Sequence, residues 1–157
     1  MFVKYIICNV SQENKVAFSK AQEQWYKTKN SIGFIGQIGG WDVTNKTKAH
    51  IISFWNSKSD LENFMLRFHD KIFDKNKQVL TYSSISISYF NINQNSIVCK
   101  LLKQHIINAN KIKIMYDASN YLCTNDMNIY FSEGIITLQC NVLEQKEIKV
   151  VDTWKIA

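Results

Sequence analysis

Four of the five glycines in the chain lie within residues 31–41, at Gly33, Gly36, Gly39 and Gly40. The stretch otherwise has the character of a strand, and glycine inside a strand is typical of a bulge or of the close approach of a ligand or another backbone. We therefore predict a strand over 34–41 with something packed unusually close to it. The sequence leaves three possibilities open: a ligand, a partner backbone or a bulge.

The segments around the glycines indicate a small α+β domain. β-branched and aromatic residues alternate in the strand segments, and apolar residues recur at helical spacing in the helix segments. In chain order we expect a strand at 2–8, a helix at 12–29, strands at 34–41 and 49–55, a helix at 60–73 and a strand at 81–90. This β-α-β-β-α-β order is ferredoxin-like, with both helices on one face of the sheet. The other face must be solvated, form an oligomer interface or line a cavity.

The second helix carries the strongest periodic pattern. Ser59 and Glu62 fit a capping box at its start. An apolar stripe then follows at Leu61, Phe64, Met65, Phe68 and Ile72. His69 lies at the edge of this stripe, one turn beyond Met65.

The rest of the chain is predicted to form a separate extension. The polar residues 91–96 are a candidate boundary, so we divide the chain into 1–95, a ferredoxin-like domain, and 96–157, a C-terminal helix plus β-meander. The pattern predicts a helix at 97–107, strands at 112–116, 127–131, 135–143 and 148–156, and connections at 132–134 and 144–146. Such an extension is small for independent stability, so we expect it to dock on the first domain. It is also able to fill the open sheet face and abolish a dimer there.

The composition limits the classes of partner that we expect. The net charge is +6, but the lysines are scattered and Arg67 is the only arginine, the residue best suited to reading phosphates and bases, so we expect no nucleic acid. The apolar runs are too short to cross a bilayer and the first residues lack the pattern of a signal peptide, so we expect no membrane and a cytoplasmic location. The four cysteines form no CxxC pair and are expected to be buried free thiols; no spacing typical of a metal site is present.

Several motifs resemble one family. They are Gly33-Phe-Ile-Gly-Gln-Ile-Gly-Gly-Trp41, the strand end Ile51-Ile-Ser-Phe-Trp55, and His69 on the second helix. Together with the helix from Ser11 to Trp25, they resemble the YdbC-like, DUF4937 family within the antibiotic biosynthesis monooxygenase-like, dimeric α/β-barrel superfamily. The resemblance covers about residues 1–95.

The resemblance implies a protomer that pairs through its open sheet face, hence a homodimer. Some relatives oxidise polyphenols without a cofactor, some degrade haem, and many have no assigned reaction. Haem degradation is disfavoured because Phe64 stands where those relatives carry a tryptophan, so we expect no cofactor. Fold alone fixes no reaction.

Five residues are the candidates for a site. His69 is the catalytic candidate, since imidazole titrates near neutrality. Trp41, Trp55, Gln37 and His50 are the candidates for binding a small hydrophobic or aromatic ligand, with the tryptophans as flat walls. Alternatively, His69 packs at a helix boundary, the tryptophans belong to the core or an interface, and Gln37 and His50 are polar sheet surface.

Two functions follow from these candidates. In the first, a monooxygenase-like enzyme acts on a planar aromatic molecule without a metal. In the second, the protein is a non-catalytic ligand-binding or structural dimer of the same fold.

Overall fold

The computed structural model describes residues 1–92, 96–116, 127–140 and 144–157. The described residues form one mixed sheet with strand order β4-β1-β3-β2-β8-β5-β7-β6. The strands are β1 (Phe2–Asn9), β2 (Phe34–Asp42), β3 (Lys48–Trp55), β4 (Ser84–Asn91), β5 (Lys111–Tyr116), β6 (Asn128–Ser132), β7 (Ile135–Gln139) and β8 (Glu144–Val150). None of the helices in these ranges is long and apolar enough to cross a membrane.

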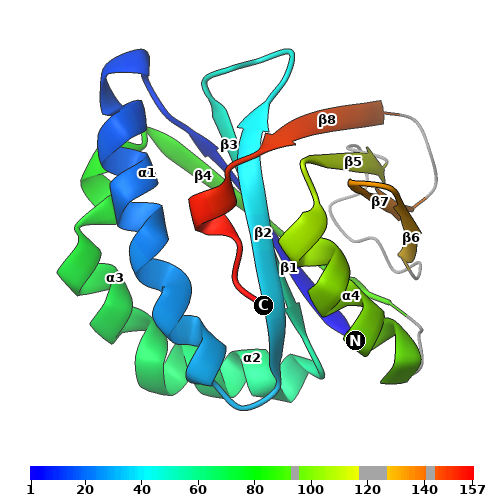
Figure 1. Ribbon diagram of the computed structural model, residues 1–157. Coiled ribbons are helices and arrows are strands. Elements are labelled where there is room, and N and C mark those ends of the chain that lie inside the picture. The colour runs from blue at the N-terminus through cyan, green and yellow to red at the C-terminus, as the bar shows by residue number, and fades with distance from the viewer. Residues whose placement is uncertain (93–95, 117–126, 141–143) are drawn as a thin grey trace.

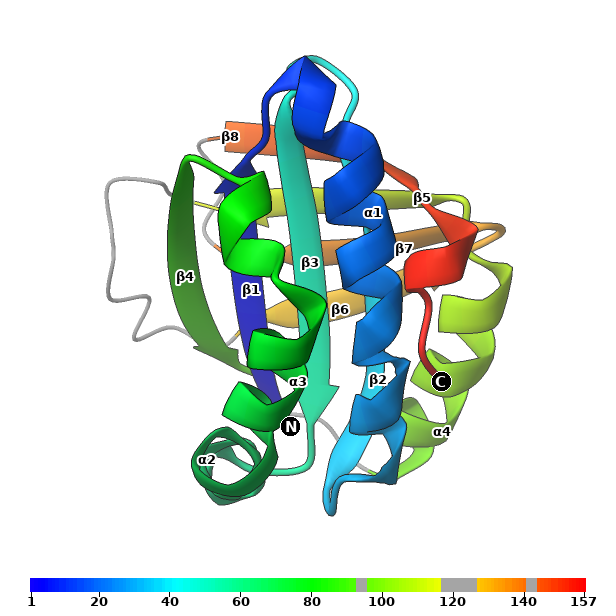
Figure 2. The same ribbon diagram turned by 90° about the vertical axis from the view of Figure 1, so that its left-hand side faces the viewer.

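The N-terminal half confirms the expected fold class. Strands β1 to β4 pair antiparallel in the ferredoxin-like order β4-β1-β3-β2. The helices α1 (Lys15–Glu23), α2 (Lys58–Phe64) and α3 (Asp70–Asn76) all cover one face of these strands (Figure 2). Two 3₁₀ segments, Gln12–Asn14 and Gln24–Asn30, extend α1 at either end to the length that the sequence predicts.

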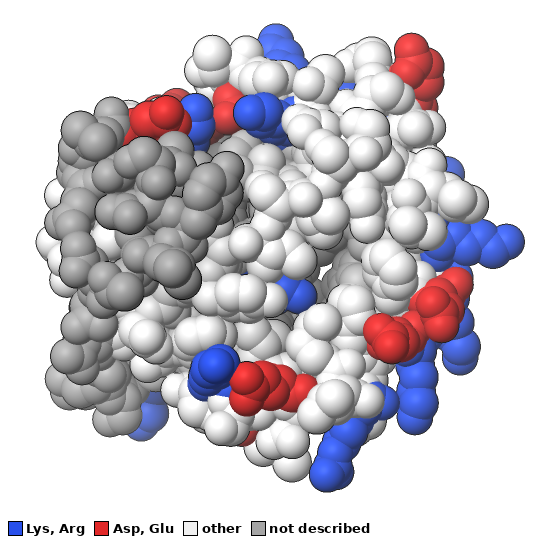
Figure 3. All heavy atoms as spheres, turned by 180° about the vertical axis from the view of Figure 1, so that it is seen from behind, with Lys and Arg blue, Asp and Glu red and all other residues white. Residues whose placement is uncertain are grey.

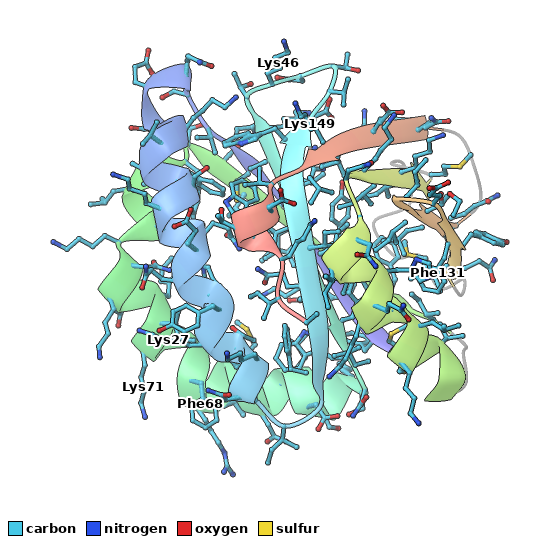
Figure 4. All side chains as sticks on the ribbon, in the orientation of Figure 1. Lys27, Lys46, Phe68, Lys71, Phe131 and Lys149 are labelled. Atoms are coloured by element: carbon cyan, nitrogen blue, oxygen red, sulfur yellow. The ribbon has the colours of Figure 1, made fainter. Side chains whose placement is uncertain are left out.

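A π-helical turn, Met65–His69, joins α2 to α3. It widens the helix, so residues beyond it no longer follow the 3.6-residue stripe. Phe68, expected on the inner stripe, is 49% exposed and points outward (Figure 4), whereas His69 faces the cavity described below. The cap also differs: Ser57, not Ser59, accepts a hydrogen bond from the Asp60 amide.

The C-terminal half contributes α4 (Ser96–Asn108) and strands β5 to β8. β6 and β7 form the expected hairpin, with Gly134 at φ +67 in its turn. However, β5 and β7 run parallel, so these strands are not connected as a simple meander. Residues 144–146, expected as a connection, begin β8 because they pair with β5.

Two further C-terminal expectations change. The strand predicted over 148–156 ends at Val150 and is followed by a 3₁₀ turn, Asp152–Trp154. The strand predicted over 135–143 is β7, and residues 141–143 lie outside the described ranges. Residues 93–95, within the candidate boundary, also lie outside them, so the division at residue 95 stays a prediction.

The C-terminal half covers the second face of strands β1 to β3 (Figure 1). The sheet bends sharply where β8 meets β2, so β5 to β7 lie across that face, and α4 packs beside β2. One apolar core joins the two halves; it includes Val3, Tyr5, Ile52 and Phe54 from the first and Leu102, Ile106, Ile112, Ile114, Ile136 and Ile148 from the second. The face through which the dimer is expected is therefore occupied by the same chain.

The glycines of β2 make room for this C-terminal segment. A Cβ at Gly40 would overlap the Lys149 carbonyl of β8, and one at Gly36 would lie 2.9 Å from the Ile156 carbonyl oxygen. Lys149 is labelled where β8 passes β2 in Figure 4. A register shift between Phe34 and Gly36 adds a bulge. Of the three possibilities, a closely packed backbone and a bulge are both present, and the backbone belongs to the same chain.

Candidate functional site

A cavity of about 200 Å³ lies between the helix layer and the sheet of the N-terminal half. Its floor comes from alternate residues of β1, β3 and β4 together with Gln37 of β2, and its roof from α1, α2, α3 and the 3₁₀ and π turns beside them. The lining is mainly apolar and includes, as polar or titratable members, Lys4, Cys8, Gln22, Thr28, Gln37, Ser53, His69, Gln78 and Tyr82. A 150 Å³ apolar cavity holds benzene, whereas drug-sized ligands need ~300 Å³ or more. The size therefore suits a molecule of one or two rings.

Aromatic side chains form much of the wall. The Trp55 and Phe64 ring centroids lie 5.1 Å apart at 35°, a favourable offset geometry. Trp55 is fully buried, and its indole N–H donates to Ser53 Oγ at 3.1 Å. Trp25 Nε1 donates to Gln78 Oε1 at 2.6 Å, which fixes the second indole. These contacts fix the orientation of both indoles, so the wall consists of flat aromatic surfaces.

His69 lines the cavity from the π turn. Its ring stacks on Phe73 at 5.5 Å and lies 5.3 Å from Trp25. Its Nδ1 lies 2.9 Å from Asp70 Oδ1, so Asp70 holds the ring orientation and leaves Nε2 for a ligand. Twenty per cent of the His69 side chain is exposed. π turns occur frequently at functional sites.

Lys4 is a cavity residue that the sequence reasoning does not single out. It lies on β1 between Phe2 and Ile6, is only 6% exposed, and has Nζ 3.5 Å from the thioether sulfur of Met65. Burial lowers the pKa of Lys4 from 10.5 to about 8, because the charged form loses its hydration. The sequence signal for Lys4 is a lysine that shares one face of a mostly buried strand with two apolar residues.

Gln37 and Thr28 place two further polar groups at the cavity, from β2 and from the 3₁₀ segment after α1. Both side chains are at least nine-tenths buried, and neither Gln37 Nε2 nor Thr28 Oγ1 has a hydrogen-bond partner within the described part of the chain. Ile156 pairs with the Gln37 backbone through hydrogen bonds of 2.7 and 2.9 Å, so the C-terminal segment positions this cavity residue.

The structure places the other two predicted residues elsewhere. His50 points to the opposite face of the sheet from Gln37. There its Nδ1 lies 2.6 Å from Tyr5 Oη and its Nε2 lies 3.3 Å from Asp42 Oδ2. Burial lowers the pKa of His50 to about 4 although Asp42 opposes the shift, so the ring is neutral at pH 7. We infer that this Tyr5-His50-Asp42 chain is structural, because the Asp42 carboxylate also accepts two loop amides.

Trp41 is on the helix side of the sheet but does not line the cavity. It packs against Phe18 and Trp154, with ring centroids 5.8 and 5.4 Å away, and Lys15 Nζ lies 4.2 Å above its ring. The cavity thus brings together His69, Trp55 and Gln37 of the predicted set, and leaves out Trp41 and His50.

The charges around the site are sparse. Within the described ranges, no three His, Cys, Asp or Glu side chains form a group that could hold a metal ion. Burial raises the pKa of the Cys8 thiol to about 12, so this cavity thiol stays protonated at neutral pH. On the face shown in Figure 3, uncharged side chains dominate the middle and the lysines are spread rather than gathered in one patch.

The fold is shared with solved structures that are described as antibiotic biosynthesis monooxygenases. A solved structure described as a "Putative antibiotic biosynthesis monooxygenase", from Nitrosomonas europaea, matches with a TM-score of 0.52 at 10% identity, over 60% of this chain and 100% of that one. A protein of the same description from Deinococcus radiodurans gives 0.51 at 12% identity, over 60% and 95% of the two chains. Identities this low show the shared fold alone.

A third solved structure extends the likeness to the C-terminal half. It is a protein from Lactobacillus acidophilus NCFM, described as a "putative monooxygenase", with a TM-score of 0.51 at 9% identity. The match covers 96% of this chain and 76% of that one. It therefore takes in α4 and β5 to β8 as well as the ferredoxin-like half.

The chain belongs to the DUF4937 family, a domain of unknown function, whose family model matches residues 2–90. A relative is the uncharacterised protein YdbC of Bacillus subtilis (strain 168), 38% identical over 92 residues, which span 57% of this chain and 77% of YdbC. The resemblance noted from the glycine stretch, Trp55 and His69 is thus confirmed. The family match ends before α4, so the C-terminal half lies outside it.

Proposed function

We propose that this protein binds a planar aromatic molecule of one or two rings in the cavity and oxidises it with dioxygen, without a metal or an organic cofactor. The observation that carries the proposal is the cavity with rigid aromatic walls and one histidine in its lining. The likeness to monooxygenase-type structures supports the reaction class, and it supplies no substrate.

His69 is the proposed general base. Its Nε2 accepts the proton of a phenolic or enolic O–H, and Asp70 beside Nδ1 stabilises the imidazolium that forms. The resulting anion is electron-rich enough to react with dioxygen directly. For 1-naphthol, one oxygen atom enters the ring as a carbonyl and the other leaves as water, giving 1,4-naphthoquinone. The atoms and the four electrons transferred to dioxygen balance.

The first experiment measures binding. Trp55 and Trp25 line the cavity, so 1-naphthol is expected to change the intrinsic tryptophan fluorescence with a saturable dependence on concentration. Turnover is measured under ¹⁸O₂, where the proposal expects one labelled oxygen per naphthoquinone in mass spectra.

Two histidine variants separate the role of His69 from a general effect. His69→Gln removes the base and is expected to lower turnover by about 100-fold or more, the usual contribution of a general base. His105→Gln is the matched control, because His105 stacks on Phe131 in the C-terminal half, away from the cavity. Binding without any labelled product would favour a non-catalytic ligand-binding protein, and absence of saturable binding would overturn the proposal.

A further inference from the structure

A row of polar residues crosses the apolar floor of the cavity. Lys4 of β1 and Gln37 of β2 each lie opposite Ser53 of β3 in register, so the three side chains stand side by side on neighbouring strands. Strands in a sheet are ~4.8 Å apart, which places the Lys4 and Gln37 backbones about 10 Å from each other. This span is comparable to the length of a two-ring aromatic molecule.

The two ends of the row carry donors with unused capacity. Lys4 Nζ has three N–H donors, and the contact that it makes is with Met65 sulfur, a weak acceptor. At the other end, Gln37 Nε2 and Thr28 Oγ1 are buried without a partner among the described residues. Buried donors are normally paired, because leaving one unpaired costs free energy. Three such donors around one cavity indicate a missing set of acceptor oxygens.

We infer that the ligand of this cavity is an aromatic carboxylate or phenolate whose anionic oxygen binds Lys4 and whose second oxygen, across the ring system, is bound by Gln37 and Thr28. The inference rests on the proposed ligand-binding role of the same cavity, and it adds the chemical class of the ligand. Ser53 lies between the two ends of the row, and its oxygen accepts the Trp55 indole N–H.

Charge complementarity favours an anion. Lys4 is mainly protonated at pH 7, because its pKa, lowered by burial to about 8, still lies above that pH. The other titratable groups of the lining are Cys8, Tyr82 and His69. Burial raises the pKa of both Cys8 and Tyr82, so these two are neutral at pH 7. An anionic ligand would replace the solvation that Lys4 loses on folding.

The test compares three probes of similar shape on the intact chain at pH 7: 2-naphthoate, its neutral analogue 2-acetylnaphthalene, and 6-hydroxy-2-naphthoate. The wild-type protein is expected to bind 2-naphthoate at least tenfold more tightly than the neutral analogue. The hydroxyl of the third probe is expected to add about a further fivefold, as one hydrogen bond of about 1 kcal/mol does.

Variants assign each end of the ligand. Lys4→Met, which keeps the side-chain volume, is expected to remove the preference for 2-naphthoate while binding of 2-acetylnaphthalene persists. Lys20→Met, at an exposed position of α1 outside the cavity, makes the same charge change and should leave both affinities unaltered. Gln37→Leu is expected to remove the gain from the hydroxyl alone. His69→Gln tests the histidine of the lining and should leave the carboxylate preference in place.

The outcomes separate the two proposals. Equal affinity for 2-naphthoate and 2-acetylnaphthalene, or a preference that survives in Lys4→Met, overturns the inference and leaves the aromatic-binding function standing. Binding of none of the three probes overturns the function together with the inference. Since Lys4→Met removes a buried charge, it is expected to fold, and its retained affinity for the neutral probe confirms that the cavity is intact.

Discussion

At the scale of single residues, Lys4 places a charged group at a position where a charge contributes least to the stability of the fold. The protonated side chain is 6% exposed in an apolar cavity, and its pKa falls to about 8 on folding. The folded state therefore binds its proton less tightly than the unfolded chain does. A buried charge of this kind is better explained by a role in ligand binding than by a contribution to stability.

Replacing Lys4 with Met should stabilise the protein by about 3 kcal/mol at pH 7, the free energy that corresponds to a pKa lowered from 10.5 to about 8. Below pH 8 both states are protonated and the folded state bears the whole penalty. Between pH 8 and 10.5 the unfolded state binds more protons, so the wild-type free energy of unfolding rises with pH relative to that of the variant. Above 10.5 the gap closes.

Urea denaturation at pH 7 and pH 10.5 measures this difference. Cys8 and Tyr82, which also titrate at high pH, are common to both proteins and cancel in the comparison. Lys20→Met serves as the control for loss of one positive charge. A Lys4→Met protein that is less stable than wild type at pH 7 would show that the lysine already has a strong partner in the folded protein.

The sequence predicts some residues of this cavity and misses others, and each miss has a physical reason. Trp55, Gln37 and His69 are found because residue type and element position suffice to suggest them. Lys4 is missed because period-2 alternation names the two faces of β1 without saying which is buried, and here both are. His50 is misplaced relative to Gln37 because the bulge between Phe34 and Gly36 changes the facing residues of β2.

At the scale of elements, the pairing of β2 with β8 depends on the absence of a side chain at Gly40. A Cβ there would overlap the Lys149 carbonyl, which is part of a backbone ladder and cannot move alone. The constraint is weaker at Gly36, because the atom nearest to an added Cβ is the flexible end of the Ile106 side chain.

Gly40→Ala should therefore destabilise the protein by about 1–3 kcal/mol, the range typical of overpacking. The loss should appear first as faster hydrogen exchange in β8, measured by mass spectrometry of its peptides. Ser86→Ala on the exposed edge strand β4 is the matched control. It also places an alanine in the sheet, but it adds no side-chain volume. Unchanged exchange in β8 with unchanged stability would show that β8 is not held by this contact.

Element order in the N-terminal half follows from the sequence, since long periodic segments and the β-α-β-β-α-β order leave little freedom. The π turn does not follow from it, because the pattern of Leu61, Phe64 and Met65 continues the ordinary helical repeat into Phe68. The parallel pairing of β5 with β7 is also missed, because residues close in sequence are normally assumed to pair as hairpins.

At the scale of the whole molecule, the covered sheet face bears on assembly. α4 and β5 to β8 share a single apolar core with β1 and β3, so a second copy cannot pack on that face unless this core opens. The homodimer implied by the superfamily resemblance would have to use another surface. The likeness of the Lactobacillus acidophilus structure over 96% of the chain supports the C-terminal half as an integral part of the fold.

We expect the protein to be a monomer of 18.3 kDa in solution. Light scattering coupled to size-exclusion chromatography measures this directly over a range of micromolar concentrations. A stable species of twice that mass would contradict the expectation. If the α4 amides of such a species were protected from hydrogen exchange, the covered face would still be closed. The dimer interface would then lie on another surface.

The glycines of β2 also have a consequence for biosynthesis. Gly40 pairs with Val150, so the strand that covers this edge is synthesised roughly a hundred residues after β2 itself. Until then the nascent chain presents a bare, glycine-rich strand edge of the kind that invites aggregation. Whatever shields that edge until β8 arrives, such as a chaperone, would affect the yield of this protein more than its final stability.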